Sequence, residues 1–126
     1  SQALGPDEDG VIVTQVVPHL TASLPIVQDY HRALHLFDPS IPPTFGSLEG
    51  YISTRILLLA LEKITGDLTR ESIMNGLEDL GQFDLGFSAP LKICRTEHQA
   101  SHQIWPTIIR NGEVLPFDWN QLKTLP

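Results

Sequence analysis

The first apolar pattern along the chain is a short β-branched run followed by a segment with helical spacing. Residues 10–17 (GVIVTQVV) are closed by Pro18 and predict a strand buried on both faces, as inside a parallel sheet. Residues 21–37 predict an amphipathic helix capped by Thr21 or Ser23, with a proline in its first turn. The positions expected to face inward are Ile26, Tyr30, Leu34 and Phe37.

A second helix is predicted from Ser47 to Ile64, ended by Gly66. Apolar side chains occupy more than one face of this helix. One face carries Leu48, Ile52, Ile56 and Leu59, and the opposite side carries Leu57, Leu61 and Ile64. No wide polar face remains, so we expect protein on all sides of the helix. The uninterrupted run is too short to span a bilayer, and Arg55 and Glu62 flank it.

The third predicted helix and the last strands follow with different spacing. Thr69 is placed to cap a helix that Gly81 ends. Its inward positions are predicted to be Ile73, Leu77 and Leu80. Strands are then expected within residues 83–87, 89–94 and 102–117. The pair Asn111-Gly112 predicts a two-residue hairpin turn between the last two strands.

This order of elements predicts an α/β fold that is incomplete by itself. A lone interior strand cannot form a sheet, and the apolar second helix needs neighbours. Two interpretations follow. The chain is part of a larger α/β protein, or it associates with copies of itself through the helix at Ile56–Leu61.

Composition narrows the class of partner. The 126 residues allow one ordinary domain, and 41% hydrophobic with 18% charged residues is a globular composition. The formal net charge of −7, without a basic cluster, disfavours nucleic acid and anionic membrane surfaces. Cys94 is the single cysteine, which excludes an intrachain disulfide. No basic and apolar leader precedes the first strand, so a signal peptide is not part of this chain.

Three segments, taken together, resemble a known family. They are EDGVIVTQVVP, SLEGYISTRILLLALEKITGDLTRESIMNGLEDLGQFDLGF and EHQASHQIWPTIIRNGEVLPF. Their order and spacing resemble the C-terminal end of the type 1 periplasmic solute-binding proteins, the leucine/isoleucine/valine-binding proteins of ABC transporters. The resemblance extends from about Glu8 to Phe117.

The resemblance implies a fold and a division of the chain. Members have two α/β lobes joined by three crossover segments, with the ligand enclosed between the lobes. Residues 1–126 would then be the C-terminal fragment of such a domain, a partial lobe of one strand, three helices and short strands with a C-terminal hairpin. Residues 1–9 would be a polar lead-in and residues 118–126 a tail.

The resemblance also implies a function. The parent protein would be a periplasmic or other extracytoplasmic component of an ABC transporter, binding a small polar ligand such as an amino acid or related carboxylate. Its other partner would be a membrane permease. Two alternatives remain open: a ligand-sensing domain of a signalling receptor, and a stand-alone module that dimerises through the apolar helix.

The candidate ligand-binding residues lie at the start of the second helix. The resemblance places Phe45, Gly46, Ser47, Leu48 and Glu49 on the cleft side. The N-terminus of a helix suits an anion, and Glu49 suits an ammonium group. The alternatives are structural: Ser47 as an N-cap, Phe45 as a packing residue and Glu49 as a complement to the helix dipole.

The sequence gives only weak signs of metal binding or catalysis. The pairs His31/His35 and His98/His102 have a spacing that a metal could use, but two ligands do not form a site. No nucleophile elbow, phosphate-binding glycine loop or cysteine signature occurs. We therefore expect no catalytic residues, no metal and no cofactor.

Overall fold

The structure is a computed structural model that describes residues 8–124. Its helices are α1 (Pro25–Phe37), α2 (Phe45–Glu62) and α3 (Arg70–Glu78). Its strands are β1 (Ile12–Gln15), β2 (Gly81–Phe83), β3 (Leu91–Ile93), β4 (Trp105–Arg110) and β5 (Glu113–Pro116), and the 3-10 helix η2 (Trp119–Thr124) follows them. The predicted order of one strand, three helices and short strands with a hairpin is confirmed.

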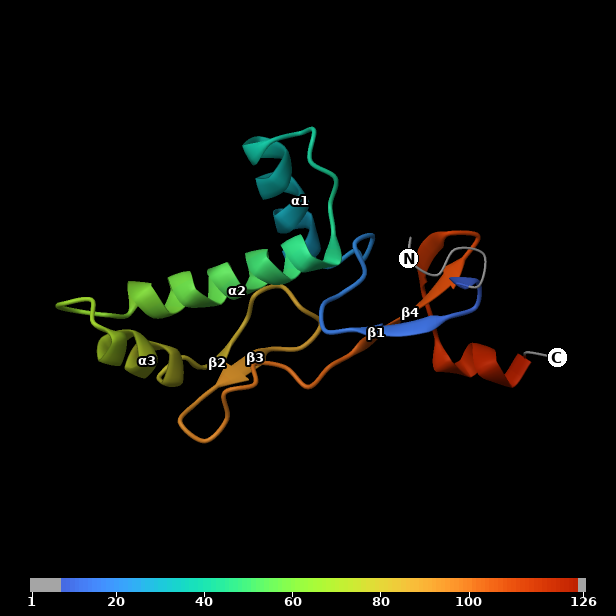
Figure 1. Ribbon diagram of the computed structural model, residues 1–126. Helices are drawn as coiled ribbons and strands as arrows, with labels where there is room; N and C mark the ends of the chain where they lie inside the picture. Colours follow the sequence, from blue (N-terminus) through green and yellow to red (C-terminus); the bar gives the residue numbers. More distant parts are fainter. Residues whose placement is uncertain (1–7, 125–126) are drawn as a thin grey trace.

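The elements form two groups (Figure 1). The first group, here called the helical body, contains α1, α2, α3, β2 and β3, and it holds both apolar core clusters. The second group, here called the strand body, is the antiparallel sheet of β1, β4 and β5. Helices and strands contact one another most extensively within each group. Residues 1–7 of the predicted lead-in and 125–126 of the predicted tail lie outside the described residues.

The first strand differs from its prediction. β1 is an edge strand that pairs antiparallel with β4, with Ile12 opposite Ile108 and Gln15 opposite Trp105. The predicted interior parallel strand is therefore wrong, and Val16 is 62% exposed. A β-branched run indicates a strand, but the partner and the covered face are decided by β4, which is far away in sequence.

The hairpin prediction is confirmed. β4 pairs antiparallel with β5, and Arg110 stands opposite Glu113. Asn111 has φ of 51° and Gly112 has φ of 78°, as a two-residue turn with positive φ at both positions requires.

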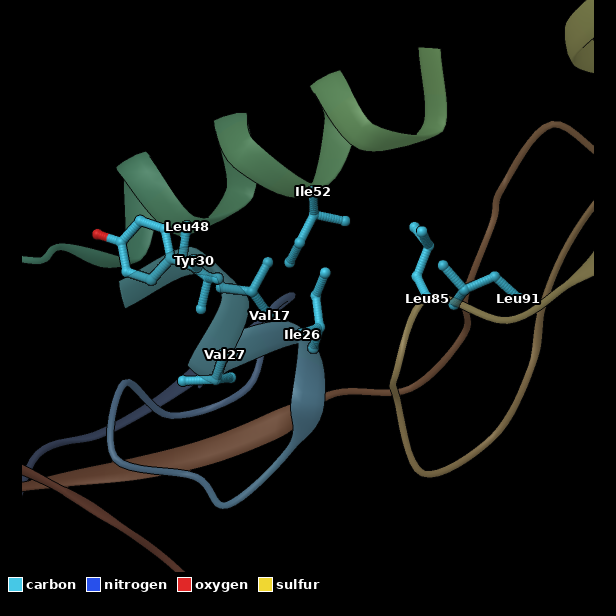
Figure 2. Packing of buried hydrophobic residues seen from close by; sticks show 8 residues of the cluster. All are labelled: Val17, Ile26, Val27, Tyr30, Leu48, Ile52, Leu85 and Leu91. Carbon is cyan, nitrogen blue, oxygen red and sulfur yellow. The ribbon is translucent and has the colours of Figure 1, made fainter. Parts of the chain in front are cut away.

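The core of the helical body lies between α1 and α2 (Figure 2). Ile26 and Tyr30 of α1 are buried as predicted, and they share a cluster with Leu48 and Ile52 of α2. Leu34 packs at the margin of this cluster. Phe37 is 81% exposed, so its predicted inward position is wrong. It is the last residue of α1, where the helix has passed the end of its core.

The start of α1 also differs from prediction. The N-cap is Leu24, whose side chain makes no capping hydrogen bond, so neither Thr21 nor Ser23 is the cap. Pro25 occupies the first helical position, where its fixed φ suits the helix and its missing N–H leaves no unpaired donor. Proline thus sets the first turn here without a polar cap.

Helix α2 begins two residues before the predicted Ser47, because Thr44 supplies the N-cap. The predicted inner face is confirmed: Leu48 and Ile52 are buried, and Ile56 and Leu59 pack against the core. The protein expected on all sides of this helix is not supplied by this chain, in which Leu57 is 39% and Leu58 is 48% exposed. One side of a strongly apolar helix therefore faces solvent in this chain.

The third helix follows its predicted cap. The Thr69 hydroxyl accepts a hydrogen bond from the Ser72 N–H, which confirms Thr69 as the N-cap of α3. Of the predicted inward positions, Leu80 is buried, Leu77 packs against its cluster and Ile73 is half-buried. Gly81, with φ of 62°, already belongs to β2. This strand therefore begins before the predicted range 83–87 and shares only Phe83 with it. Its partner β3 lies within the predicted 89–94.

Candidate functional site

A capping box fixes the start of α2. The Ser47 N–H donates to the Thr44 hydroxyl at 3.1 Å, and the Thr44 N–H donates to the Ser47 hydroxyl at 3.2 Å. Ser47 is therefore the third helical residue and not the N-cap. This reciprocal pairing provides acceptors for two backbone N–H groups at the helix start, those of Thr44 and Ser47.

Tyr30 ties this helix start to α1. Its hydroxyl lies 2.6 Å from the Ser47 hydroxyl and accepts a hydrogen bond from the Thr44 N–H at 3.2 Å. The Tyr30 side chain is buried, so the pair holds α1 and α2 together through a partly buried contact. The Ser47 hydroxyl is thus engaged within the protein.

The four predicted site residues point in different directions. Leu48 has no exposed surface and lies in the core (Figure 2). Phe45 is half-buried and meets the edge of the His19 ring, with 5.7 Å between the ring centroids. Ser47 faces Tyr30. Glu49 is exposed and is the one of these four residues that lines a pocket.

This pocket has a volume of about 360 Å³ and lies between α2 and the segment that leads into β4. The α2 wall presents Glu49 and Ser53 over Ile52 and Ile56. The facing wall presents polar side chains from residues 99–103. The apolar residues that complete the lining are Val16, Val17, Phe87, Leu91, Ala100, Ile104 and Trp105.

Hydrogen bonds between residues two positions apart shape the facing wall of the pocket. The Gln99 N–H donates to the Glu97 carboxylate at 3.0 Å, and the Gln99 side-chain amide donates to the Ser101 carbonyl at 3.0 Å. The Gln99 N–H lowers the pKa of Glu97, and His102, whose Nε2 is 3.4 Å from the Glu97 carboxylate, lowers it further. Glu97 is half-buried, and the lowered pKa reflects this local turn and not a deeply buried charge.

Three of the four paired histidines contact other groups. His98 lies 3.1 Å from Glu78, His102 pairs with Glu97, and the His31 Nε2–H donates to the Leu20 carbonyl at 2.7 Å. Within residues 8–124, no cluster of three or more His, Cys, Asp or Glu side chains could hold a metal ion. In the same residues, no helix has the length and apolar character needed to cross a membrane.

Sequence reasoning found one wall of the pocket and missed the other. Residues 99–103 carry polar side chains without helical or strand spacing, so no periodic pattern singled them out. The available signal was the density of amide, hydroxyl and imidazole groups just before a strand, which is typical of a binding loop. Together the walls offer a carboxylate, amides and hydroxyls over an apolar floor, which suits a small molecule with hydrogen-bond donors and an apolar part.

Residues 1–113 match the family model described as periplasmic binding protein. The chain therefore belongs to the periplasmic binding protein family, and the predicted type 1 resemblance is confirmed. Comparison with curated proteins gives no match.

Solved structures agree with this assignment. A possible leucine/isoleucine/valine-binding protein from Rhodopirellula baltica SH 1 is 44% identical, with a TM-score of 0.90 over 96% of this chain and 33% of its own. A fatty acid ABC transporter substrate-binding protein from Thermomonospora curvata is 23% identical, with a TM-score of 0.73 over 93% of this chain and 33% of its own.

An ABC transporter substrate-binding protein from Desulfitobacterium hafniense, in complex with Leu, is 22% identical. Its TM-score is 0.68, over 88% of this chain and 32% of its own. At these lower identities the likeness shows the fold alone. The chain spans about a third of the length of these three structures.

Proposed function

We propose that this chain is the C-terminal part of an extracytoplasmic solute-binding protein of an ABC transporter, and that the ligand is an amino acid or a related carboxylate. The observation that carries the proposal is the Glu49 pocket in a chain 44% identical to a possible leucine/isoleucine/valine-binding protein.

In this proposal the start of α2 is one wall of the ligand site. Glu49 faces the ligand, and its carboxylate accepts hydrogen bonds from an ammonium group. Phe45, the first residue of α2, does not line this pocket. Ser47 and Leu48 hold that wall in place, through Tyr30 and through the core respectively. The second lobe supplies the remaining contacts.

The mechanism is hinge closure without bond chemistry. A ligand that contacts both lobes stabilises the closed conformation more than the open one and shifts the population toward it. A membrane permease then distinguishes the closed form from the open form. Hydrogen bonds and charge complementarity determine which solute is held.

The test is thermal unfolding of a protein with both lobes, screened against the L-amino acids and small carboxylates. A ligand at one hundred times its Kd is expected to add about 2.7 kcal/mol to the free energy of unfolding. Residues 1–126 alone are expected to give no shift, because they supply one wall. Failure of every amino acid and carboxylate to stabilise the two-lobed protein would refute the proposed ligand class.

The substitution Glu49→Gln tests the role of this carboxylate. It removes the charge and keeps the shape, so affinity for the amino acid found in the screen is expected to fall about 10- to 100-fold, as for loss of a charged hydrogen bond. Isothermal titration calorimetry measures the change. Glu62→Gln, at the other end of α2, is the matched control and is expected to bind normally. Equal affinities of both variants would exclude Glu49 from the site.

We also propose that the isolated chain self-associates through the exposed apolar side of α2 at Ile56–Leu61. The exposure of Leu57 and Leu58 supports this, because association would remove their side chains from water. Leu58→Glu is expected to convert a dimer or larger species into a monomer by light scattering. Leu68→Glu is the control, since Leu68 is 66% exposed outside α2. A monomeric unsubstituted chain would contradict this proposal.

A further inference from the structure

Few connections join the helical body to the strand body. The chain passes from β1 into the helical body through Val16, Val17 and Pro18, and it returns through Trp105 at the start of β4. Within the strand body, the Thr107 hydroxyl donates to the Val13 carbonyl, and the Asn111 N–H donates to the Asp9 carboxylate. Across the junction, the rings of Phe87 and Trp105 lie 6.0 Å apart. The angle between the bodies therefore depends on what spans the junction.

The His19 ring spans this junction. Its Nε2 lies 2.9 Å from the carbonyl oxygen of Val114 in β5, which is 95 positions away in sequence. Its Nδ1 accepts a hydrogen bond from the Thr21 N–H at 3.2 Å and lies 2.8 Å from the Thr21 hydroxyl. One imidazole thus connects the segment before α1 to the C-terminal hairpin.

These hydrogen-bond partners indicate which nitrogen of the His19 ring carries the hydrogen. A carbonyl oxygen only accepts, so Nε2 must carry the hydrogen that it shares with Val114. A backbone N–H only donates, so Nδ1 accepts from the Thr21 N–H. These contacts correspond to the Nε2–H tautomer, and both nitrogens are used.

The same ring also contacts the proposed ligand wall. The edge of His19 meets Phe45, the first residue of α2, with 5.7 Å between centroids and 70° between the planes. Edge-to-face contacts of this kind are attractive and orient both rings. A movement of the hairpin relative to α2 must therefore break the Val114 hydrogen bond or displace the ring from Phe45.

We infer that His19 is a positioning residue that holds the strand body at a fixed angle to the start of α2. Its ring acts as a strut between β5 and the wall that contains Phe45 and Glu49. This inference about geometry is independent of any ligand. Its consequence for ligand binding rests on the proposed function: the His19 ring keeps the wall that contains Glu49 at one angle to the strand body.

The test is nuclear magnetic resonance of the 126-residue chain and of His19→Phe. The phenylalanine ring keeps the contact with Phe45 and loses both nitrogens. Residual dipolar couplings of the unsubstituted chain are expected to fit one alignment tensor for both bodies, and those of His19→Phe are expected to require two. One shared tensor in His19→Phe, or two in the unsubstituted chain, would overturn the inference.

A matched control separates the junction from ordinary loss of a histidine hydrogen bond. His31→Phe removes a comparable bond, from the ring Nε2–H to the Leu20 carbonyl, within the helical body. It is expected to keep one shared tensor. Separate tensors in His31→Phe as well would mean that the bodies loosen after any local loss, and the role assigned to His19 would be wrong.

A second measurement applies even where His19→Phe does not fold. Nitrogen-15 spectra of the imidazole in the unsubstituted chain are expected to show the Nε2–H tautomer of His19, with slowed exchange of that hydrogen. An Nδ1–H tautomer would overturn the inference. Failure of amino acids to bind the two-lobed protein would refute the proposed function and leave these spectra unchanged.

Discussion

Leu48→Ala is expected to lower the free energy of unfolding by about 3 kcal/mol. Leu48 has no exposed surface, and it packs among Ile26, Val27 and Tyr30 between α1 and α2 (Figure 2). Replacing a buried leucine with alanine removes its transfer free energy and leaves a cavity, at a typical cost of about 2 to 5 kcal/mol. Urea denaturation followed by circular dichroism measures the change.

Leu57→Ala on the same helix is the matched control. Leu57 is 39% exposed, so its truncation removes less buried surface and is expected to cost below about 1 kcal/mol. Similar losses for both variants would mean that the two faces of α2 are equally covered in solution. That result would contradict the core described here and would agree with a covered outer face.

Gly86→Ala is expected to destabilise the chain by more than about 2 kcal/mol. Gly86 has φ of +83°, and an added Cβ would lie 2.7 Å from the Pro25 Cβ and 2.9 Å from the Ile26 backbone nitrogen. The Ile26 N–H donates to the Gly86 carbonyl at 3.3 Å, so the loop lies directly against the first turn of α1. Positive φ and backbone crowding add to each other in this variant.

Gly81→Ala separates the two contributions. Gly81 has φ of +62°, but nothing lies within 4 Å of an added Cβ. Its substitution is expected to cost about 1 kcal/mol, the conformational strain alone. Thermal and urea unfolding of both variants give the comparison. If Gly86→Ala costs no more than Gly81→Ala, the loop and α1 are not in close contact in solution.

Local signals in the sequence were sufficient for much of this fold. Asn111-Gly112 predicted the hairpin, because its backbone requirement is met within two residues. Thr69 predicted the start of α3 for the same reason, since a cap acts over one turn. The inner face of α2 followed from apolar spacing at Leu48 and Ile52.

Features that depend on distant segments were not predictable in this way. β1 has the composition of an interior strand, yet β4 covers only one of its edges and Val16 is largely exposed. The apolar side of α2 at Leu57 and Leu58 resembled a buried surface, but within the described residues solvent reaches both side chains. Composition records which surfaces favour burial, and only the fold determines which of them are covered.

The candidate site likewise contains one part that the sequence predicted and one part that depends on distant segments. Glu49 was predicted from its place in the first turns of a helix, and it lines the pocket. The facing wall at residues 99–103 is brought close by the return of the chain toward β4, which no local pattern encodes. The family resemblance placed Leu48 on the cleft side together with Glu49, although successive helical residues point about 100° apart.

The antiparallel pairing of β1 with β4 limits how the two segments that join the strand body to the helical body can move. A slip by one residue would turn every side chain of a strand to the other surface of the sheet, so sliding along this seam is disfavoured. Pro18, almost fully buried just beyond β1, further restricts the backbone on that side. A movement of the strand body relative to the helical body is therefore expected to be a rotation about a nearly fixed axis, because neither connecting segment can slide past the other.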